Sequence, residues 1–195
     1  MDKDKALESV NEIKELMEKS SKFVSLSGIT AVLAGVYALI GAYVADNLLN
    51  SVNNRGGVII TALMVLMVSA ITACILSWYK ARATGQKLFS KLTYRIVWNF
   101  AFPLLAGGLF CLALLLHENY GLISSAMLLF YGLSLVNVSK YTYSNVAWLG
   151  AVFVCLGIAN SFFEGHALLF WTIGFGGIHI LYGALFYLQY ERKRR

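Results

Sequence analysis

The chain has 195 residues, of which 58% are hydrophobic and only 13% are charged, and its mean hydropathy is +0.67. Charged residues make up about a quarter of an ordinary soluble domain, so this composition excludes a soluble globular protein. The net charge of +6 does not indicate a nucleic-acid-binding protein, because the basic residues are confined to the segments between long apolar runs.

Six apolar runs follow one another along the chain. Each is about 20 residues long, which is the length that an α-helix needs to cross a hydrocarbon layer of about 30 Å. The predicted spans are residues 23–45, 57–79, 97–116, 120–138, 144–163 and 167–189. We therefore expect an all-α polytopic membrane protein whose six transmembrane helices form one domain, residues 23–189. Because the connections are short, neighbouring spans should pair antiparallel.

Residues 1–22 precede the first span and are predicted to form a short amphipathic helix in the cytoplasm. Ala6, Val10 and Ile13 share one face at helical spacing, whereas Glu8 and Glu12 lie on the opposite face. A helix that lies on an anionic membrane surface has a basic polar face, and this one is predominantly acidic. It is therefore expected to pack on the protein's own cytoplasmic loops or on a second copy, or to bind a soluble regulatory partner.

All of the 16 basic residues except Arg55 fall on one side of the predicted topology. They occupy the N-terminal segment, the connections after the second and fourth spans, and a basic tail at residues 190–195. By the positive-inside rule this side is the cytoplasm. The sequence thus predicts a multi-pass protein of the cell (inner or plasma) membrane, with both termini in the cytoplasm and the lipid bilayer as its main partner.

The only proline, Pro103, lies inside the third span. Proline lacks the amide hydrogen that would bond the carbonyl four residues earlier, which here belongs to Asn99. In a membrane the freed carbonyl needs another donor. We expect the Asn99 side chain or a neighbouring helix to supply the compensation.

His179 lies near the middle of the sixth span. Gly176 and Gly183 stand three residues before it and four after it, on the same face of an α-helix. A face with two glycines favours contact with another helix, so the imidazole should point into the bundle. Its predicted partners are Tyr37 and Tyr131, each near the middle of its own span.

Two interpretations of this group stay open. Polar groups inside a membrane often mark a functional site, so His179, Tyr37, Tyr131 and Asn160 are candidates for binding a ligand or a proton. The alternative is that the histidine only forms a hydrogen bond between two helices.

A second polar group is expected at the outer face, where each external connection carries an acid. Three carboxylates and two imidazoles could attract a cation there, and solvated loop residues are the alternative. The residues are Asp46, His117, Glu118, Glu164 and His166. The sequence holds no zinc-ligand spacing, nucleophile motif or phosphate-binding loop. We therefore expect no catalytic residue, no metal site and no cofactor.

Residues 17–28, which run into Gly35-Val-Tyr-Ala-Leu-Ile-Gly41, and residues 130–141 resemble a family of small bacterial integral membrane proteins. The resemblance extends over most of the chain. It implies a six-span membrane protein and, because such proteins look like neighbours of small winged-helix regulators, a regulatory partner. The family has no assigned function, so the resemblance carries over no functional residue.

These observations lead to two main functional hypotheses. The first is a small transporter or channel that forms a homo-oligomer and has a polar site around His179. The second is a non-enzymatic membrane sensor or scaffold that acts through residues 1–22 and a soluble regulatory partner. An intramembrane enzyme has no supporting motif, and the charge distribution gives no support to a nucleic-acid partner.

Overall fold

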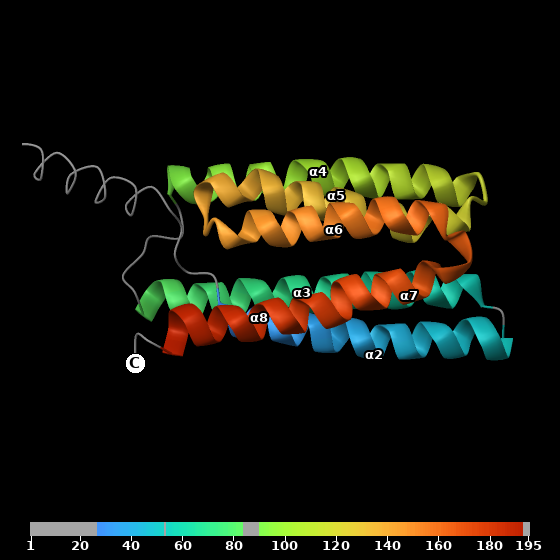
Figure 1. The fold of residues 1–195 in the computed structure, drawn as a ribbon, viewed down its shortest axis with the longest axis horizontal. Coiled ribbons are helices and arrows are strands. Elements are labelled where there is room, and N and C mark those ends of the chain that lie inside the picture. Colours follow the sequence, from blue (N-terminus) through green and yellow to red (C-terminus); the bar gives the residue numbers. More distant parts are fainter. Residues whose placement is uncertain (1–26, 53, 84–89, 193–195) are drawn as a thin grey trace, which may run out of the picture.

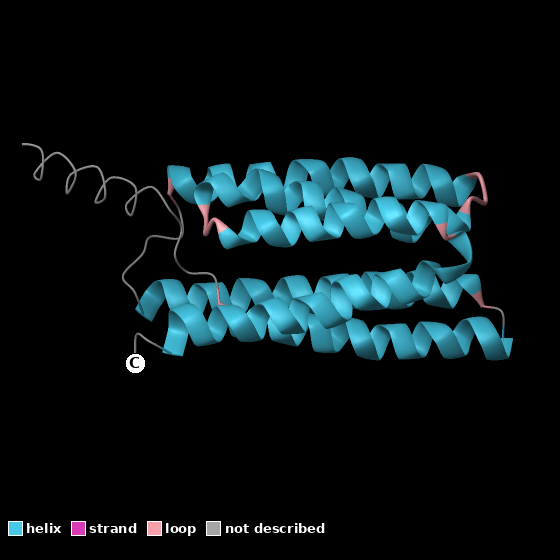
Figure 2. Ribbon diagram, in the orientation of Figure 1, coloured by secondary structure: helices cyan, strands magenta, loops and turns pink. Residues whose placement is uncertain are grey.

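The computed structural model describes residues 27–52, 54–83 and 90–192. The helix predicted at residues 1–22, the start of the first predicted span and residues 193–195 of the basic tail lie outside the described residues. The described part consists of helices and short loops, with no strand in it (Figure 2).

Six helical segments of the described chain are long and apolar enough to cross a membrane. The first three are α2 (Gly28–Val52), α3 (Arg55–Ala83) and α4 (Lys91–Leu116). The fourth comprises a 3-10 turn η1 (Tyr120–Leu122), α5 (Ile123–Val138) and a second turn η2 (Ser139–Tyr141), and the fifth is α6 (Asn145–Phe162). After the turn η3 (Glu164–His166), the last span alternates between α- and π-helix: α7 (Ala167–Trp171), η4 (Thr172–Ile178), α8 (His179–Phe186) and η5 (Tyr187–Glu191).

The six predicted spans are therefore present as helices, and several extend beyond the apolar runs that predicted them. The third helix, for example, begins at Lys91 instead of at Val97, with Ser90 as its N-terminal cap. The Ser90 hydroxyl accepts a hydrogen bond from the Thr93 amide at 3.1 Å. Apolar runs mark the part of a helix that suits hydrocarbon, whereas capping residues set where the helix starts.

The helices form two sets of three (Figure 1). In the central set α5 packs against both α4 and α6, and in the terminal set α2 packs against α3 and against the last span. The predicted antiparallel pairs α2–α3, α4–α5 and α5–α6 are thus confirmed. The prediction does not hold for α3 and α4, nor for α6 and the last span, because each of these consecutive pairs is divided between the two sets. The first helix pairs with the last span instead. Consecutive spans run in alternating directions between two ends of the bundle, which we call the Arg55 end and the C-terminal end.

Glycines bring helix backbones into direct contact inside each set. In the central set a methyl group at Gly132 would lie 2.7 Å from the carbonyl oxygen of Gly150, and a methyl group at Gly150 would lie 2.7 Å from that of Gly132. In the terminal set a methyl group at Gly183 would lie 2.5 Å from the carbonyl oxygen of Gly28. Such close approach is typical of helices that associate in lipid, where packing replaces the hydrophobic effect between helices.

The outer faces of the bundle are apolar. The exposed large side chains of α3 include Leu63, Met64, Met67 and Ile71, and Ala81 is the only buried residue of this helix. Exposed apolar surface on this scale is unfavourable in water. Together with the six span-length helices it indicates a membrane protein.

Pro103 lies inside the continuous helix α4, and the carbonyl that it frees has found a donor. The Asn137 side chain of α5 donates its Nδ2 hydrogen to the Asn99 carbonyl oxygen at 2.9 Å. The Asn99 side chain instead bonds the Arg95 carbonyl at 2.7 Å. Of the two predicted sources of compensation, the neighbouring helix is therefore the one that is used.

Asn137→Leu should lower the free energy of unfolding by about 1–2 kcal/mol, because it leaves the Asn99 carbonyl without a donor. Pro103→Ala supplies an amide hydrogen within α4, so the same leucine substitution should have little effect in that background. The four proteins can be compared by titration with SDS in mixed micelles, followed by circular dichroism. An equal loss of stability with Pro103 and with Ala at that position would show that Asn137 does not act through this carbonyl.

Candidate functional site

His179 lies in the interior of the bundle, where the terminal set meets the central set. Its side chain is 6% exposed, and its Nε2 atom lies 2.7 Å from the Tyr131 hydroxyl of α5. Its Nδ1 atom lies 3.3 Å from the Gly174 carbonyl oxygen. A carbonyl can only accept, so we assign the proton to Nδ1, and Nε2 then accepts from the tyrosine hydroxyl. Both ring nitrogens of a neutral imidazole are thereby paired.

Aromatic rings surround this hydrogen bond. The imidazole centroid lies 5.3 Å from that of Tyr131, 5.1 Å from that of Phe153 and 6.0 Å from that of Phe175. Phe153 of α6 is fully buried. The polar pair therefore lies in an apolar, well-packed environment, where leaving either partner unpaired is costly.

The glycines beside His179 contact a different helix from those that the imidazole contacts. Methyl groups at Gly176 and Gly183 would meet α2, at Leu39 and at Gly28 respectively, whereas the imidazole meets α5 and α6. The prediction that the histidine points into the bundle is confirmed. Between Gly176 and His179 the chain is π-helical, so the α-helical projection does not hold there, whereas Gly183 follows His179 within the α-helix α8.

Tyr37 and Asn160 are not part of the His179 cluster. Tyr37 is half-buried on α2 and makes no hydrogen bond or ring contact with the described residues. Asn160 is fully buried nearer the Arg55 end, where its Nδ2 atom donates to the Ser124 hydroxyl at 2.9 Å. That hydroxyl donates to the Ala167 carbonyl at 2.8 Å, and the Asn160 Oδ1 atom has no partner among the described residues. The structure thus brings together two of the four predicted residues, Tyr131 and His179.

The residues of the predicted outer cluster lie at the surface wherever the structure describes them. Asp46, His117, Glu118 and His166 are exposed, and the Glu164 side chain lies outside the described part of the structure. Asp46 accepts a hydrogen bond from the Asn50 side chain at 3.0 Å. Among the described residues no three histidine, cysteine, aspartate or glutamate side chains are placed to hold a metal ion.

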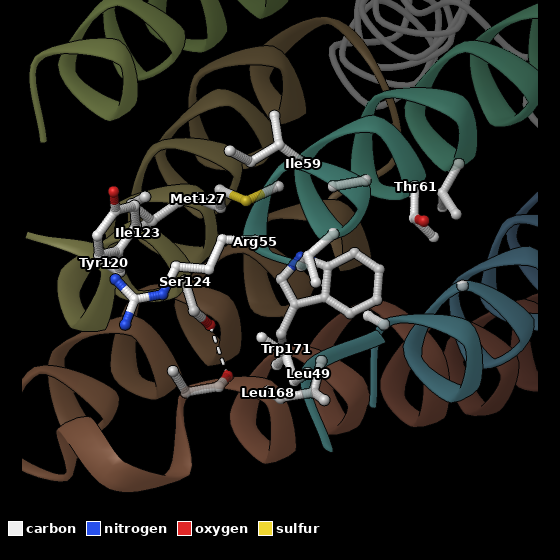
Figure 3. Close-up of a pocket in the computed structure, with 16 residues that line it drawn as sticks. Leu49, Arg55, Ile59, Thr61, Tyr120, Ile123, Ser124, Met127, Leu168 and Trp171 are labelled. Atoms are coloured by element: carbon white, nitrogen blue, oxygen red, sulfur yellow. Dashed lines mark hydrogen bonds between the residues drawn. The ribbon is translucent and has the colours of Figure 1, made fainter. Parts of the chain in front are cut away.

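A cavity of about 290 Å³ lies between the two sets, near the Arg55 end (Figure 3). The residues around it come from α2, α3, the η1–α5 segment and α7, and most of them are apolar. They are Gly41, Ala45, Leu49, Arg55, Val58, Ile59, Thr61, Ala62, Val65, Tyr120, Ile123, Ser124, Met127, Ala167, Leu168 and Trp171. No predicted site residue is among them, because each helix contributes ordinary apolar positions and only the fold brings these together.

Arg55 is the only charged residue among those that line the cavity. It is the first residue of α3, and its guanidinium lies 4.4 Å from the centre of the Tyr120 ring. Figure 3 shows the two side chains next to each other, with the hydroxyl of Ser124 nearby. Tyr120 belongs to the central set and Arg55 to the terminal set, so this cation–π contact bridges the two sets. The signal for Arg55 in the sequence was its position as the only basic residue on its side.

Ring contacts connect the cavity to the His179 cluster. Trp171 lines the cavity, its ring lies 5.3 Å from that of Phe175, and Phe175 stacks on His179. A change at the cavity wall can therefore reach the Tyr131–His179 hydrogen bond through two aromatic rings. No protein-family model, curated protein or solved structure matches this chain, so any functional conclusion depends on this geometry.

Proposed function

We propose that this chain is a small membrane carrier that binds its solute in the cavity between the two sets of helices. The single observation that carries this proposal is the position of the cavity: it lies at the junction of the sets, between the Arg55–Tyr120 contact and the Tyr131–His179 hydrogen bond. Sites at the junction of two helical units, in which one unit rocks against the other, are typical of transporters.

The contacts within and between the sets support motion of one set against the other. Inside each set, glycines place backbone against backbone, as at Gly132 and Gly150. At the junction the contacts involve side chains: a methyl group at Gly174, for example, would meet the side chains of Leu128 and Phe153. Side-chain contacts rearrange more easily than packed backbones, so each set is suited to move as a rigid unit.

Bridging contacts at the two ends of this region would then act as alternate closures. Separation of Arg55 from Tyr120 and of Ser124 from Ala167 opens the cavity toward the Arg55 end. Separation of Tyr131 from His179 opens it toward the C-terminal end. Because the imidazole is enclosed by rings and both of its nitrogens are paired, an alternating carrier agrees with this geometry better than a continuous channel.

The distribution of basic residues supports one orientation in the membrane. Lys80, Arg82, Lys91 and Lys140 flank helix ends at the C-terminal end of the bundle. With this end in the cytoplasm, the cavity lies in the outer half of the cell membrane. The alternative role as a sensor or scaffold depends on residues 1–22, which lie outside the described residues.

Accessibility of an engineered cysteine tests the carrier proposal. In a chain whose Cys74, Cys111 and Cys155 are replaced by alanine, Ala45→Cys places a thiol in the cavity wall. A membrane-impermeant methanethiosulfonate should label it from the outer side of oriented vesicles. Tyr131→Phe should increase labelling from the cytoplasmic side about tenfold, because it removes the hydrogen bond that holds this side closed.

Ala42→Cys is the matched control, since Ala42 lies on the same helix and is equally buried but does not line the cavity. It should stay unlabelled from both sides in both backgrounds. Cytoplasmic labelling of Ala45→Cys that does not respond to Tyr131→Phe would count against the carrier proposal. Equal labelling of the two cysteines would mean that the reagent reaches the bundle generally.

A further inference from the structure

Some polar groups of the cavity wall already form hydrogen bonds within the protein, and others do not. The Thr61 hydroxyl donates to the Gly57 carbonyl at 2.8 Å, and the Ser124 hydroxyl donates to the Ala167 carbonyl at 2.8 Å. Both hydroxyl hydrogens are therefore unavailable to a ligand. The remaining wall is dominated by aliphatic side chains and Trp171, and such a surface disfavours a solute that is polar over its whole length.

Arg55, in contrast, has hydrogen-bond donors to spare. A guanidinium carries five N–H donors, and that of Arg55 makes no ion pair with the described acidic side chains, Asp46 and Glu118. Its Cζ atom lies over the Tyr120 ring, and one ring cannot engage all five donors, so N–H groups remain for a bidentate carboxylate or phosphate. Arg55 also begins a helix of 29 residues, and the N-terminus of a helix favours negative charge.

The volume of the cavity limits the size of a ligand whose carboxylate or phosphate binds Arg55. Its volume of about 290 Å³ lies at the lower end of the range for small-molecule sites. The space extends from Arg55 to Trp171 along apolar side chains (Figure 3). One apolar chain suits this space, whereas a phospholipid would have to place two.

We infer that the cavity binds a single-chain amphipathic anion, whose carboxylate or phosphate pairs with Arg55 while its apolar chain lies against Trp171. This inference rests on the proposed function for the location of the site, and it adds the chemical class of the solute. Loss of Arg55 should weaken binding of the anion without affecting binding of a neutral amphiphile of the same length.

Fluorescence of Trp171 provides the test. Trp78, Trp98 and Trp148 are exposed, and replacing them by phenylalanine leaves Trp171 as the only indole. The protein in nanodiscs is titrated with 11-bromoundecanoate, whose bromine quenches an indole on contact. Because Trp171 is 9% exposed, probe dissolved in the lipid should quench it weakly, and saturable quenching requires entry into the cavity.

We expect saturable quenching by 11-bromoundecanoate and a half-saturating concentration at least tenfold higher for the neutral 11-bromoundecanol. Arg55→Gln should raise the value for the carboxylate at least tenfold. Arg82→Gln is the matched control, because Arg82 lies on the same helix at the opposite end, and it should change the value less than threefold.

Other outcomes of this experiment distinguish failure of the single-chain anion as the ligand from failure of the cavity as a solute site. If the alcohol binds as tightly as the carboxylate and Arg55→Gln has no effect, the cavity binds apolar chains, and only the anionic class is wrong. If a phosphatidylglycerol with brominated chains quenches Trp171 saturably, the single-chain assignment is wrong. If neither bromoundecyl probe quenches saturably, both the inference and the cavity as a solute site are wrong. The comparison of acid with alcohol uses unaltered Arg55, so it remains decisive even if Arg55→Gln fails to fold.

Discussion

Gly132→Ala is expected to lower the free energy of unfolding by about 3 kcal/mol, because the added methyl group has no space at the crossing of α5 and α6. It would lie 2.7 Å from the Gly150 carbonyl oxygen and 2.8 Å from the Val154 amide nitrogen. Both atoms belong to the backbone of α6, so no side chain can move aside and the two helices must separate. Titration with SDS in mixed micelles measures the loss of stability.

Gly108→Ala in α4 is the matched control. A methyl group at Gly108 meets nothing within 4 Å, and alanine favours a helix over glycine by up to about 1 kcal/mol. This substitution should therefore be neutral or slightly stabilising. Equal effects of the two alanine substitutions would mean that the α5–α6 crossing is looser than the structure shows.

Gly150→Ala offers an independent check of the same crossing. Its methyl group would lie 2.7 Å from the Gly132 carbonyl oxygen, so the single change should be about as harmful as Gly132→Ala. The double variant should lose less stability than the sum of the two, because helices that one methyl group has already separated can accept the second. Strict additivity would indicate two separate causes.

The sequence predicted the helices of this protein better than their arrangement. An apolar run identifies a span by itself, because the thickness of the hydrocarbon layer alone sets the length and composition that the helix needs. The assignment of α3 and α4 to different sets depends on contacts between segments distant in the chain, and no periodicity within one helix contains that information. For the same reason Pro103 predicted that the Asn99 carbonyl needs a donor but could not identify Asn137 as the neighbouring residue that supplies it.

The candidate site could also be predicted only in part: the sequence indicated its polar residues but not the cavity. His179 is noticeable in a sequence because an imidazole inside an apolar span is unusual, and its pairing with Tyr131 was one of two proposed alternatives. The π-helix before His179 could not be predicted from a 3.6-residue period, so the α-helical projection that related Gly176 to His179 does not hold. The cavity was missed altogether, because its wall combines residues such as Ala45, Met127 and Trp171 that look ordinary in their own helices.

The second large effect is expected at the Tyr131–His179 pair. His179→Leu should lower the free energy of unfolding by about 3 kcal/mol, because it removes a ring from an aromatic cluster and leaves the Tyr131 hydroxyl without its acceptor. Tyr131→Phe should cost about 1 kcal/mol, since the ring contacts remain and only the hydrogen bond is lost. In the double variant the Tyr131 hydroxyl, which His179→Leu leaves unpaired, is removed, so adding Tyr131→Phe to His179→Leu should restore part of the stability.

The same double variant separates a structural role of this pair from a role in closure. If the hydrogen bond only holds the bundle together, a double variant that regains stability should also regain one-sided labelling of Ala45→Cys. If the hydrogen bond closes the cavity toward the cytoplasm, the thiol should stay accessible from that side, because two apolar side chains provide packing but no directional bond across the junction. The carrier proposal requires the second result, and a stable double variant that is labelled only from the outer side would contradict it.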